Sequence, residues 1–220
     1  MEASFEKKIL AIKDWLGTGS INIFGLPMSG KDTVGMRLAR AVDGKFLSSG
    51  RIIRAMETAN NQHLTAGGDL IDTNVFYDWV LPYFEREDLK NFPLVLSSIG
   101  RWAGEEDKVI ETAKRSGHPI KAVIILNVSE ADVANRWQTV NEMGPEVNRE
   151  NRADDKSYDV FEKRIQEFIH KTMPVVLHYR QLGLLIEVNA DMDRDQVFVE
   201  LIEKLFAFVE KQGEVSPSLT

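Results

Sequence analysis

Short apolar runs alternate with helical patterns along almost the whole chain, and this alternation is the strongest constraint on its fold. The apolar runs cover residues 21–24, 45–47, 94–97, 122–128 and 184–188. Each run has the length of a buried strand and is followed by apolar residues at helical spacing. Strands that alternate with helices form a parallel sheet with right-handed crossovers and helices on both faces. We therefore predict an α/β fold with a five-stranded parallel sheet flanked by helices.

The predicted helices lie between these strands and at the two ends of the chain. The helical patterns cover residues 33–42, 105–116, 130–138, 158–182 and 194–211, and a longer region at 51–85. An amphipathic helix over 4–16 precedes the first strand and ends at the glycines at 17 and 19. Ligands of such sheets bind at the carboxyl ends of the strands, so the residues that follow each strand are the first candidates for a site.

The composition is typical of one globular domain. The 220 residues are 43% hydrophobic and 28% charged, which excludes a disordered or collagen-like chain. No cysteine is present, which excludes a disulfide framework, a thiolate zinc site and a cysteine nucleophile. The net charge of −7 opposes broad adhesion to nucleic acid or to anionic lipid. Any anion must therefore be bound by a local cluster of basic residues.

The first residues and the overall hydropathy give an expected location. Charged residues interrupt the first 17 positions, which therefore lack the apolar core of a signal peptide. No segment reaches the roughly 20 apolar residues that span a bilayer. We expect a soluble, cytoplasmic protein without a membrane or nucleic-acid partner.

A glycine-rich loop joins the first strand to the next helix. It reads Gly-Leu-Pro-Met-Ser-Gly-Lys-Asp-Thr from Gly25 to Thr33. In a strand–loop–helix context, the backbone N–H groups of such a loop surround phosphate oxygens at the helix N-terminus. Lys31 brings a positive charge to the terminal phosphates, and Thr33 offers its hydroxyl to Mg²⁺. The alternative is a tight turn with a solvated lysine, which the complete pattern disfavours.

The hydroxyl stands two residues after the lysine instead of one, and in this respect the loop resembles that of adenylate kinase and other nucleoside monophosphate kinases. A glycine commonly separates lysine from threonine in that family, and Asp32 takes its place here. The resemblance covers about residues 21–190, through the segments 48–54, 68–72, 152–155 and 172–174 together with Arg101, Arg136 and Arg164. It implies a phosphotransferase that moves the γ-phosphoryl group of Mg·ATP to a nucleoside monophosphate, most simply AMP.

The resemblance also implies a role for each matching residue. Around ATP it places Gly25, Ser29, Gly30, Lys31, Asp32, Thr33 and Arg136, the last of these stacked on the adenine. Around the monophosphate it places Ser49, Gly50, Arg54, Arg101 and Glu105. The groups implied in catalysis are Lys31, Arg101, Arg152 and Arg164, and those implied near Mg²⁺ are Thr33 and Ser97. Arginines suit phosphoryl transfer because they stay charged and bind phosphate with two donors.

The same resemblance divides the single domain, residues 1–220, into parts. It implies a core of residues 21–50, 90–139 and 152–212, a monophosphate-binding insert at 51–81 and a short lid at 140–151. The lid has no cysteines for a zinc knuckle. The helix within residues 1–17 is not typical of the family, and we expect it on the sheet edge or on a partner subunit of a small homo-oligomer, unless the protein is a monomer.

Several positions depart from the family pattern. Ser97 stands where the family has an aspartate that helps to hold the Mg²⁺ hydration shell, and Asp32 either restores that carboxylate or repels phosphate. Arg51 replaces another aspartate and adds positive charge beside Arg54. Glu105 replaces a glutamine that reads the acceptor base, and it serves either that purpose or as a first-turn acid of its helix.

Three alternatives stay open at this point. Any single arginine can be a solvated surface charge, as we expect of Arg40, Arg86 and Arg180. The pair Asp154 and Asp155 either caps the next helix or binds the arginines. The departures also fit a kinase of another small-molecule acceptor, or a nucleotide-binding regulatory protein with impaired catalysis.

Overall fold

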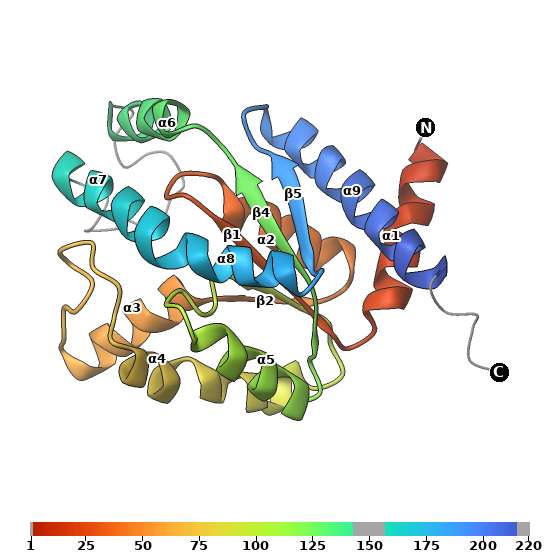
Figure 1. Cartoon of the computed structure of the whole chain (residues 1–220), viewed down its shortest axis with the longest axis horizontal. Helices are drawn as coiled ribbons and strands as arrows, with labels where there is room; N and C mark the ends of the chain where they lie inside the picture. Colours follow the sequence, from red (N-terminus) through yellow and green to blue (C-terminus); the bar gives the residue numbers. More distant parts are fainter. Residues whose placement is uncertain (1, 143–156, 215–220) are drawn as a thin grey trace.

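The computed structural model describes residues 2–142 and 157–214, and it contains the predicted parallel sheet. In this part of the chain five strands lie in the order β2-β3-β1-β4-β5 (Figure 1). They are β1 (Ser20–Gly25), β2 (Lys45–Ser48), β3 (Leu94–Ser97), β4 (Ile120–Asn127) and β5 (Leu185–Asn189). The observed ends agree with the predicted ones within two residues, and all pairings are parallel.

The central strand β1 fixes where the glycine-rich loop begins. All six of its residues are buried, as expected for a strand with neighbours on both sides and helices on both faces. Ile23 is in register with Ser97 of β3, and Gly25 is in register with Leu126 of β4. The loop therefore leaves the middle of the sheet, next to the end of β3.

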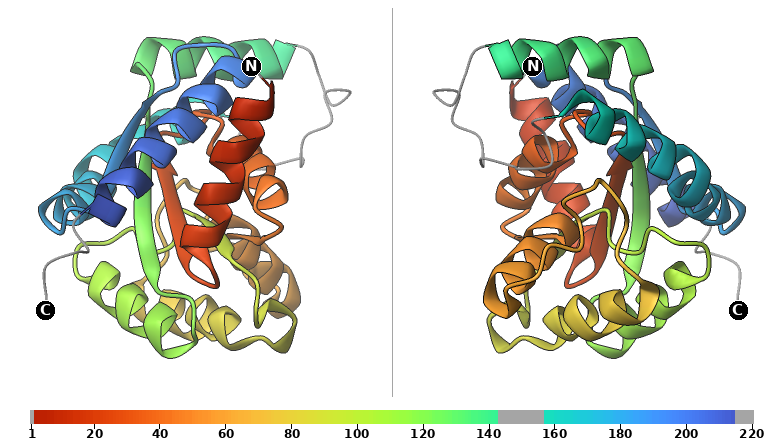
Figure 2. Two further views of the ribbon diagram at one scale, coloured as in Figure 1. Left: turned by 90° about the vertical axis from the view of Figure 1, so that its right-hand side faces the viewer. Right: turned by 90° about the vertical axis from the view of Figure 1, so that its left-hand side faces the viewer.

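One face of the sheet is covered by α1 (Glu2–Leu16), α2 (Lys31–Ala41) and α9 (Arg194–Glu214). Apolar side chains of these helices pack against Ile21 and Ile23 of β1 and Ile124 of β4. Figure 2 shows α1 beside α9 on this side of the molecule. None of the helices within the described residues is long and apolar enough to cross a bilayer.

The opposite face packs against the remaining helices, because alternate strand residues point to opposite faces. Phe24 of β1 lies there among side chains of α6 (Glu130–Glu142), α7 (Tyr158–Glu167) and α8 (Met173–Gln181). The predicted helix at 158–182 contains a π-helical segment, η4 (Phe168–Thr172), between α7 and α8. This segment was not predicted, because an apolar period does not reveal a change in the hydrogen-bond pattern.

The region at 51–85 also differs from a continuous helical pattern. It contains α3 (Ser49–Asn60), a loop, α4 (Thr73–Trp79) and two 3₁₀ turns, η1 (Leu81–Glu85) and η2 (Glu87–Leu89). Asp72 caps α4 by accepting a hydrogen bond from the backbone N–H of Asn74 at 2.8 Å. Side chains of α3, α4 and η1 form a second apolar cluster with Leu94 and Leu96 of β3 and with α5 (Glu105–Arg115).

The helix α1 packs on α9, and the expectation that it lies on the sheet edge is wrong. The ring centroids of Phe5 and Phe198 are 6.3 Å apart, and those of Trp15 and Phe208 are 6.1 Å apart. Leu16 is fully buried in the same cluster as β1. The apolar face of α1 is therefore part of the core beside α9.

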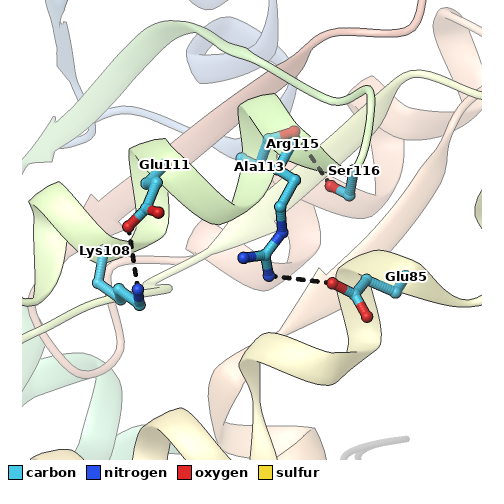
Figure 3. A network of polar contacts seen from close by, with 6 residues as sticks. All are labelled: Glu85, Lys108, Glu111, Ala113, Arg115 and Ser116. Atoms are coloured by element: carbon cyan, nitrogen blue, oxygen red, sulfur yellow. Dashed lines mark hydrogen bonds and ion pairs between the residues drawn. The ribbon is translucent and has the colours of Figure 1, made fainter.

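The outer face of α5 carries exposed charged side chains. The Lys108 ammonium is 3.0 Å from the Glu111 carboxylate, and the Arg115 guanidinium is 3.0 Å from the Glu85 carboxylate. Figure 3 shows both pairs. Such exposed pairs contribute little to the free energy of unfolding. They provide residues that can be changed as controls for charges in the cleft described below.

The packing of α1 leads to a prediction about stability. Replacement Leu16→Ala is expected to lower the free energy of unfolding by about 2–5 kcal/mol, because it leaves a cavity in the core. Leu10→Ala on the same helix, at a side chain that is 57% exposed, is expected to change it by less than about 0.5 kcal/mol. Urea unfolding followed by circular dichroism measures both, and equal effects would contradict the placement of Leu16 in the core.

Candidate active site

The glycine-rich loop connects the carboxyl end of β1 to the first turn of α2. Gly30 is the N-cap residue of α2 with φ +86°, a left-handed conformation that glycine adopts without strain. A Cβ atom at Gly25 would lie 2.6 Å from the Oγ of Ser29, so only glycine permits this close approach. Met28 also has a positive φ of 66°, which is unusual for its type and common in ligand-binding loops. The loop therefore has a tight backbone conformation that depends on the glycines at 25 and 30.

A cleft opens beside this loop and gathers most of the residues that the sequence singled out. Ten of them line it: Gly25, Lys31, Asp32, Ser49, Gly50, Arg54, Ser97, Arg101, Glu105 and Arg164. It encloses about 910 Å³ of space, including the part that is open to solvent.

The other predicted site residues lie elsewhere. Ser29, Gly30, Thr33 and Arg136 are in or near the loop but do not line the cleft. The Oγ of Ser29 is buried and has no hydrogen-bond partner in the described part of the chain, whereas Thr33 is exposed on the first turn of α2. Arg152, the pair Asp154 and Asp155, and residues 143–151 of the predicted lid lie outside the described residues.

Arg101 and Arg164 line the same cleft, and the charge of Arg164 acts on Arg101. Burial, followed by the positive charge of Arg164, lowers the pKa of the Arg101 guanidinium to about 10. The Nε of Arg101 is buried without a hydrogen-bond partner in residues 2–142 and 157–214. A buried guanidinium beside another cation is stabilised by a bound anion. This pair is the strongest electrostatic indication of an anionic ligand.

Arg54 enters the cleft from the first turns of α3. A Cβ atom at Gly50, one turn earlier, would lie 3.1 Å from the Nη1 of Arg54, so Gly50 leaves room for the guanidinium. The neighbouring Ser49 donates its hydroxyl hydrogen to the carbonyl of Ser98 at 2.7 Å, which joins α3 to the end of β3. Arg54 is thereby held near Arg101, which follows the same strand.

Glu105 is buried and its carboxylate accepts hydrogen bonds from three protein groups. Its Oε2 accepts from the backbone N–H groups of Arg101 at 2.7 Å and Trp102 at 3.0 Å. Its Oε1 accepts from the Oγ1 of Thr73 at 2.9 Å. Burial raises the pKa of this carboxyl group, while these hydrogen bonds oppose the rise. The geometry thus favours the structural interpretation, in which Glu105 orients the loop that carries Arg101.

Two further arginines have contacts that the sequence did not indicate. The guanidinium of Arg51 lies 5.5 Å from the ring centroid of Phe46 and 3.5 Å from the Sδ of Met36, and Arg51 does not line the cleft. Its expected role beside Arg54 is therefore not supported.

Arg136 donates to the carbonyls of Met28 at 3.4 Å and Ala190 at 2.5 Å. It joins the glycine-rich loop to the end of β5, and its stacking on adenine stays a prediction.

Trp102 lines the cleft next to Arg101 and was not predicted from the sequence. Its Nε1 donates to the carbonyl of Ile71 at 3.0 Å, and the Nζ of Lys171 lies 4.1 Å from the centroid of its ring. The position of Trp102 directly after a strand was the available signal. Lys171 belongs to the π-helical segment, so its contact with the Trp102 ring could not be inferred from the sequence.

The loop after α3 is held to α7 on the far side of the cleft. Asp69 forms an ion pair with the Nζ of Lys163 at 2.7 Å, next to Arg164 on the same helix. Glu57 accepts hydrogen bonds from the backbone N–H and the Oγ1 of Thr65, at 2.7 and 2.9 Å. Figure 1 shows this loop beside α7. The insert therefore forms one wall of the cleft.

Oxygen groups near the loop fit a magnesium ion that is held mainly by a nucleotide. Asp32 accepts a hydrogen bond from the Oγ of Ser97 at 2.6 Å, and Thr33 follows Asp32 in the first turn of α2. Among residues 2–142 and 157–214, no three His, Asp or Glu side chains form a metal site of their own. Mg²⁺ is commonly held by one or two protein oxygens and by substrate phosphates, so a sparse set of hard donors is suitable.

The contacts of Glu105 lead to a prediction that separates its two interpretations. Glu105→Gln is expected to lower the free energy of unfolding by about 1–3 kcal/mol, because the amide NH₂ group faces backbone N–H donors. Glu111→Gln, at an exposed position of the same helix, is expected to change it by less than about 0.5 kcal/mol. Chemical denaturation of both variants gives the comparison. Unchanged stability of Glu105→Gln with altered base preference would instead support a role in reading the acceptor.

Comparison of the sequence with known proteins gives relatives that are named adenylate kinase. A scan against protein-family models finds no match. The adenylate kinase of Xanthomonas euvesicatoria pv. vesicatoria is 26% identical over 190 residues, which cover 83% of this chain and 97% of that protein. The adenylate kinase of Streptococcus equi subsp. equi is 24% identical over 202 residues, which cover 81% and 94%. The resemblance to adenylate kinases is thereby confirmed over most of the chain.

The fold is also found among solved structures. A gluconokinase from Sinorhizobium meliloti 1021 superposes with a TM-score of 0.59 at 18% identity, over 90% of this chain and 98% of that one. This likeness confirms the P-loop kinase fold. Together, the comparisons support a phosphotransferase of the P-loop kinase type that is similar to adenylate kinases.

Proposed function

We propose that this protein is a nucleoside monophosphate kinase that transfers the γ-phosphoryl group of Mg·ATP to a nucleoside monophosphate, most simply AMP. The observation that best supports it is the pair of half-buried arginines, Arg101 and Arg164, in the same cleft as Lys31. One cleft that joins a phosphate loop to a second cluster of cations suits two anionic substrates. Relatives named adenylate kinase agree with this assignment.

The proposed mechanism follows from what phosphoryl transfer requires. Little covalent chemistry is needed, so the protein acts by placing donor and acceptor in line and by balancing the charge on the transferred oxygens. The loop amides and Lys31 hold the donor phosphates. Arg54 and Arg101 hold the acceptor phosphate, and Arg164 balances charge during transfer, together with Arg152 outside the described residues.

The proposed mechanism also requires that water be excluded from the cleft. Closure of the insert over the cleft would remove water that otherwise hydrolyses ATP. When Mg²⁺ is bound with the nucleotide, it neutralises charge on the β- and γ-phosphates. Thr33 would hold it through its hydroxyl, with Asp32 and Ser97 beside it.

A second candidate is a P-loop kinase with another small-molecule acceptor. It is favoured by the three protein donors on the Glu105 carboxylate, which leave this group little capacity to read a base. Trp102 and the apolar side chains of Ile53, Ile71 and Phe76 line the same part of the cleft. An acceptor that lacks a base would still use Arg54 and Arg101 if it were anionic.

The kinase proposal is tested by ATP-dependent phosphorylation of AMP, CMP, UMP, GMP and dTMP with Mg²⁺. We expect turnover of one monophosphate, with AMP first in order. Lys31→Ala and Arg101→Ala are each expected to lower kcat by about 100-fold or more, because each removes a charge aimed at the phosphates. Arg115→Ala, an exposed arginine of α5, serves as the control and is expected to retain full activity. Nucleotide binding without consumption of any monophosphate would contradict the proposal.

A further prediction separates the two arginines of α3. Arg54→Ala is expected to raise KM for the acceptor by about tenfold or more, because it removes a charged donor from the cleft. Arg51→Ala, whose side chain contacts Phe46 and Met36, is expected to change KM by less than about twofold. Steady-state kinetics with varied acceptor measures both constants. The reverse order of effects would show that Arg51 faces the acceptor.

A further inference from the structure

We propose that Asp32 makes nucleotide binding depend on magnesium, by disfavouring the metal-free triphosphate and favouring its Mg²⁺ complex, and that Ser97 positions the Asp32 carboxylate for this purpose. The inference rests on the proposed nucleotide-binding function. It concerns a residue that directly follows Lys31 and lies in the wall of the cleft.

The contact between Asp32 and Ser97 joins two elements that are distant in the sequence. The Oγ of Ser97 donates to the Oδ1 of Asp32 at 2.6 Å, from the end of β3 to the first turn of α2. The Ser97 side chain is buried, and Asp32 is half-buried. One side of the carboxylate is therefore fixed from the sheet, which limits the rotamers that Asp32 can adopt.

Asp32 differs in its place in the chain from the other acids that line the cleft. The Asp69 carboxylate is in an ion pair with Lys163, and the carboxylate of Glu105 accepts three hydrogen bonds from the protein. Both lie in the part of the cleft formed by the insert and α5. Asp32 instead stands in the phosphate loop itself, between Lys31 and Thr33. Of the acids that line this cleft, it is the one placed next to the expected donor phosphates.

A carboxylate at this position has opposite effects on the two forms of the nucleotide. Its charge repels the oxygens of a metal-free triphosphate and offsets part of the attraction of Lys31. With Mg²⁺ bound, the same carboxylate would attract the cation and could accept hydrogen bonds from its water molecules. The difference between these two interactions is a coupling between metal and nucleotide, and such coupling is reciprocal.

A purely structural role for Asp32 is the alternative. An acid in the first turn of a helix interacts favourably with the helix dipole, and Asp32 occupies that turn of α2. That role would affect stability and would leave the magnesium dependence of binding unchanged. The two roles therefore differ in a quantity that can be measured.

The test measures ATP binding by isothermal titration calorimetry, once with Mg²⁺ and once with EDTA. The variants are Asp32→Asn, Ser97→Ala and the control Asp43→Asn. Asparagine at 32 keeps the oxygen that accepts from Ser97 and removes only the charge. Asp43 lies just beyond the other end of α2 and forms an ion pair with Lys13. Its backbone is in the left-handed region, which asparagine tolerates. Its replacement therefore removes the same charge outside the cleft.

We expect the ratio of Kd in EDTA to Kd in Mg²⁺ to fall about tenfold in Asp32→Asn, mainly through tighter binding of metal-free ATP. Ser97→Ala is expected to change the ratio in the same direction by about threefold, and Asp43→Asn to leave it unchanged. Titration of Mg²⁺ into the protein–ATP complex is expected to show a matching loss of metal affinity in Asp32→Asn.

The possible failures are distinguishable. An unchanged ratio in a folded Asp32→Asn protein would overturn the inference and leave the kinase proposal intact. A ratio that changes equally in Asp43→Asn would also overturn it, because the effect would then come from net charge. Failure of the unmodified protein to bind ATP in either buffer would overturn the proposed function, and with it the role of Asp32.

Discussion

The parallel pairing of β1 with β3 on one side and β4 on the other determines where everything else in this protein lies. It places the carboxyl end of β1 in the middle of the sheet, with the end of β3 directly beside it. Because of this register, a hydroxyl at Ser97 reaches a carboxylate at Asp32, although 65 residues separate them. The glycine-rich loop, Arg101 and the start of α3 meet at one edge of the sheet for the same reason.

Hydrogen bonds of Glu105 and Ser49 fix the backbone segments that carry the cleft arginines. The carboxylate of Glu105 fixes the backbone that carries Arg101, and Ser49 ties the start of α3 to the end of β3. These hydrogen bonds position the backbone that carries Arg101 and the start of α3, the helix that carries Arg54. Burial and Arg164 make the charge of Arg101 less favourable, so a bound anion would relieve an existing cost.

Much of the fold and part of the site followed from the sequence, for physical reasons that differ between elements. All five strands were predicted, because buried parallel strands are short continuous apolar runs. The loop from Gly25 to Thr33 was also predicted, because its chemistry is local. The position of α1 was not, since an amphipathic helix shows that it has a buried face but not which surface covers it. The contacts of Arg51 were missed because a residue three positions from Arg54 was assumed to share its surroundings.

The sequence by itself determined the alternation of strands and helices, the phosphate loop and the set of arginines that could bind anions. Only the tertiary structure decided which of these groups face one cleft. It placed the Glu105 carboxylate against the backbone N–H groups of Arg101 and Trp102, placed Trp102 in the cleft wall, and joined Asp32 to Ser97. The physical reason is that helical and strand periods are encoded locally, whereas a side-chain contact between distant segments depends on strand register and helix packing.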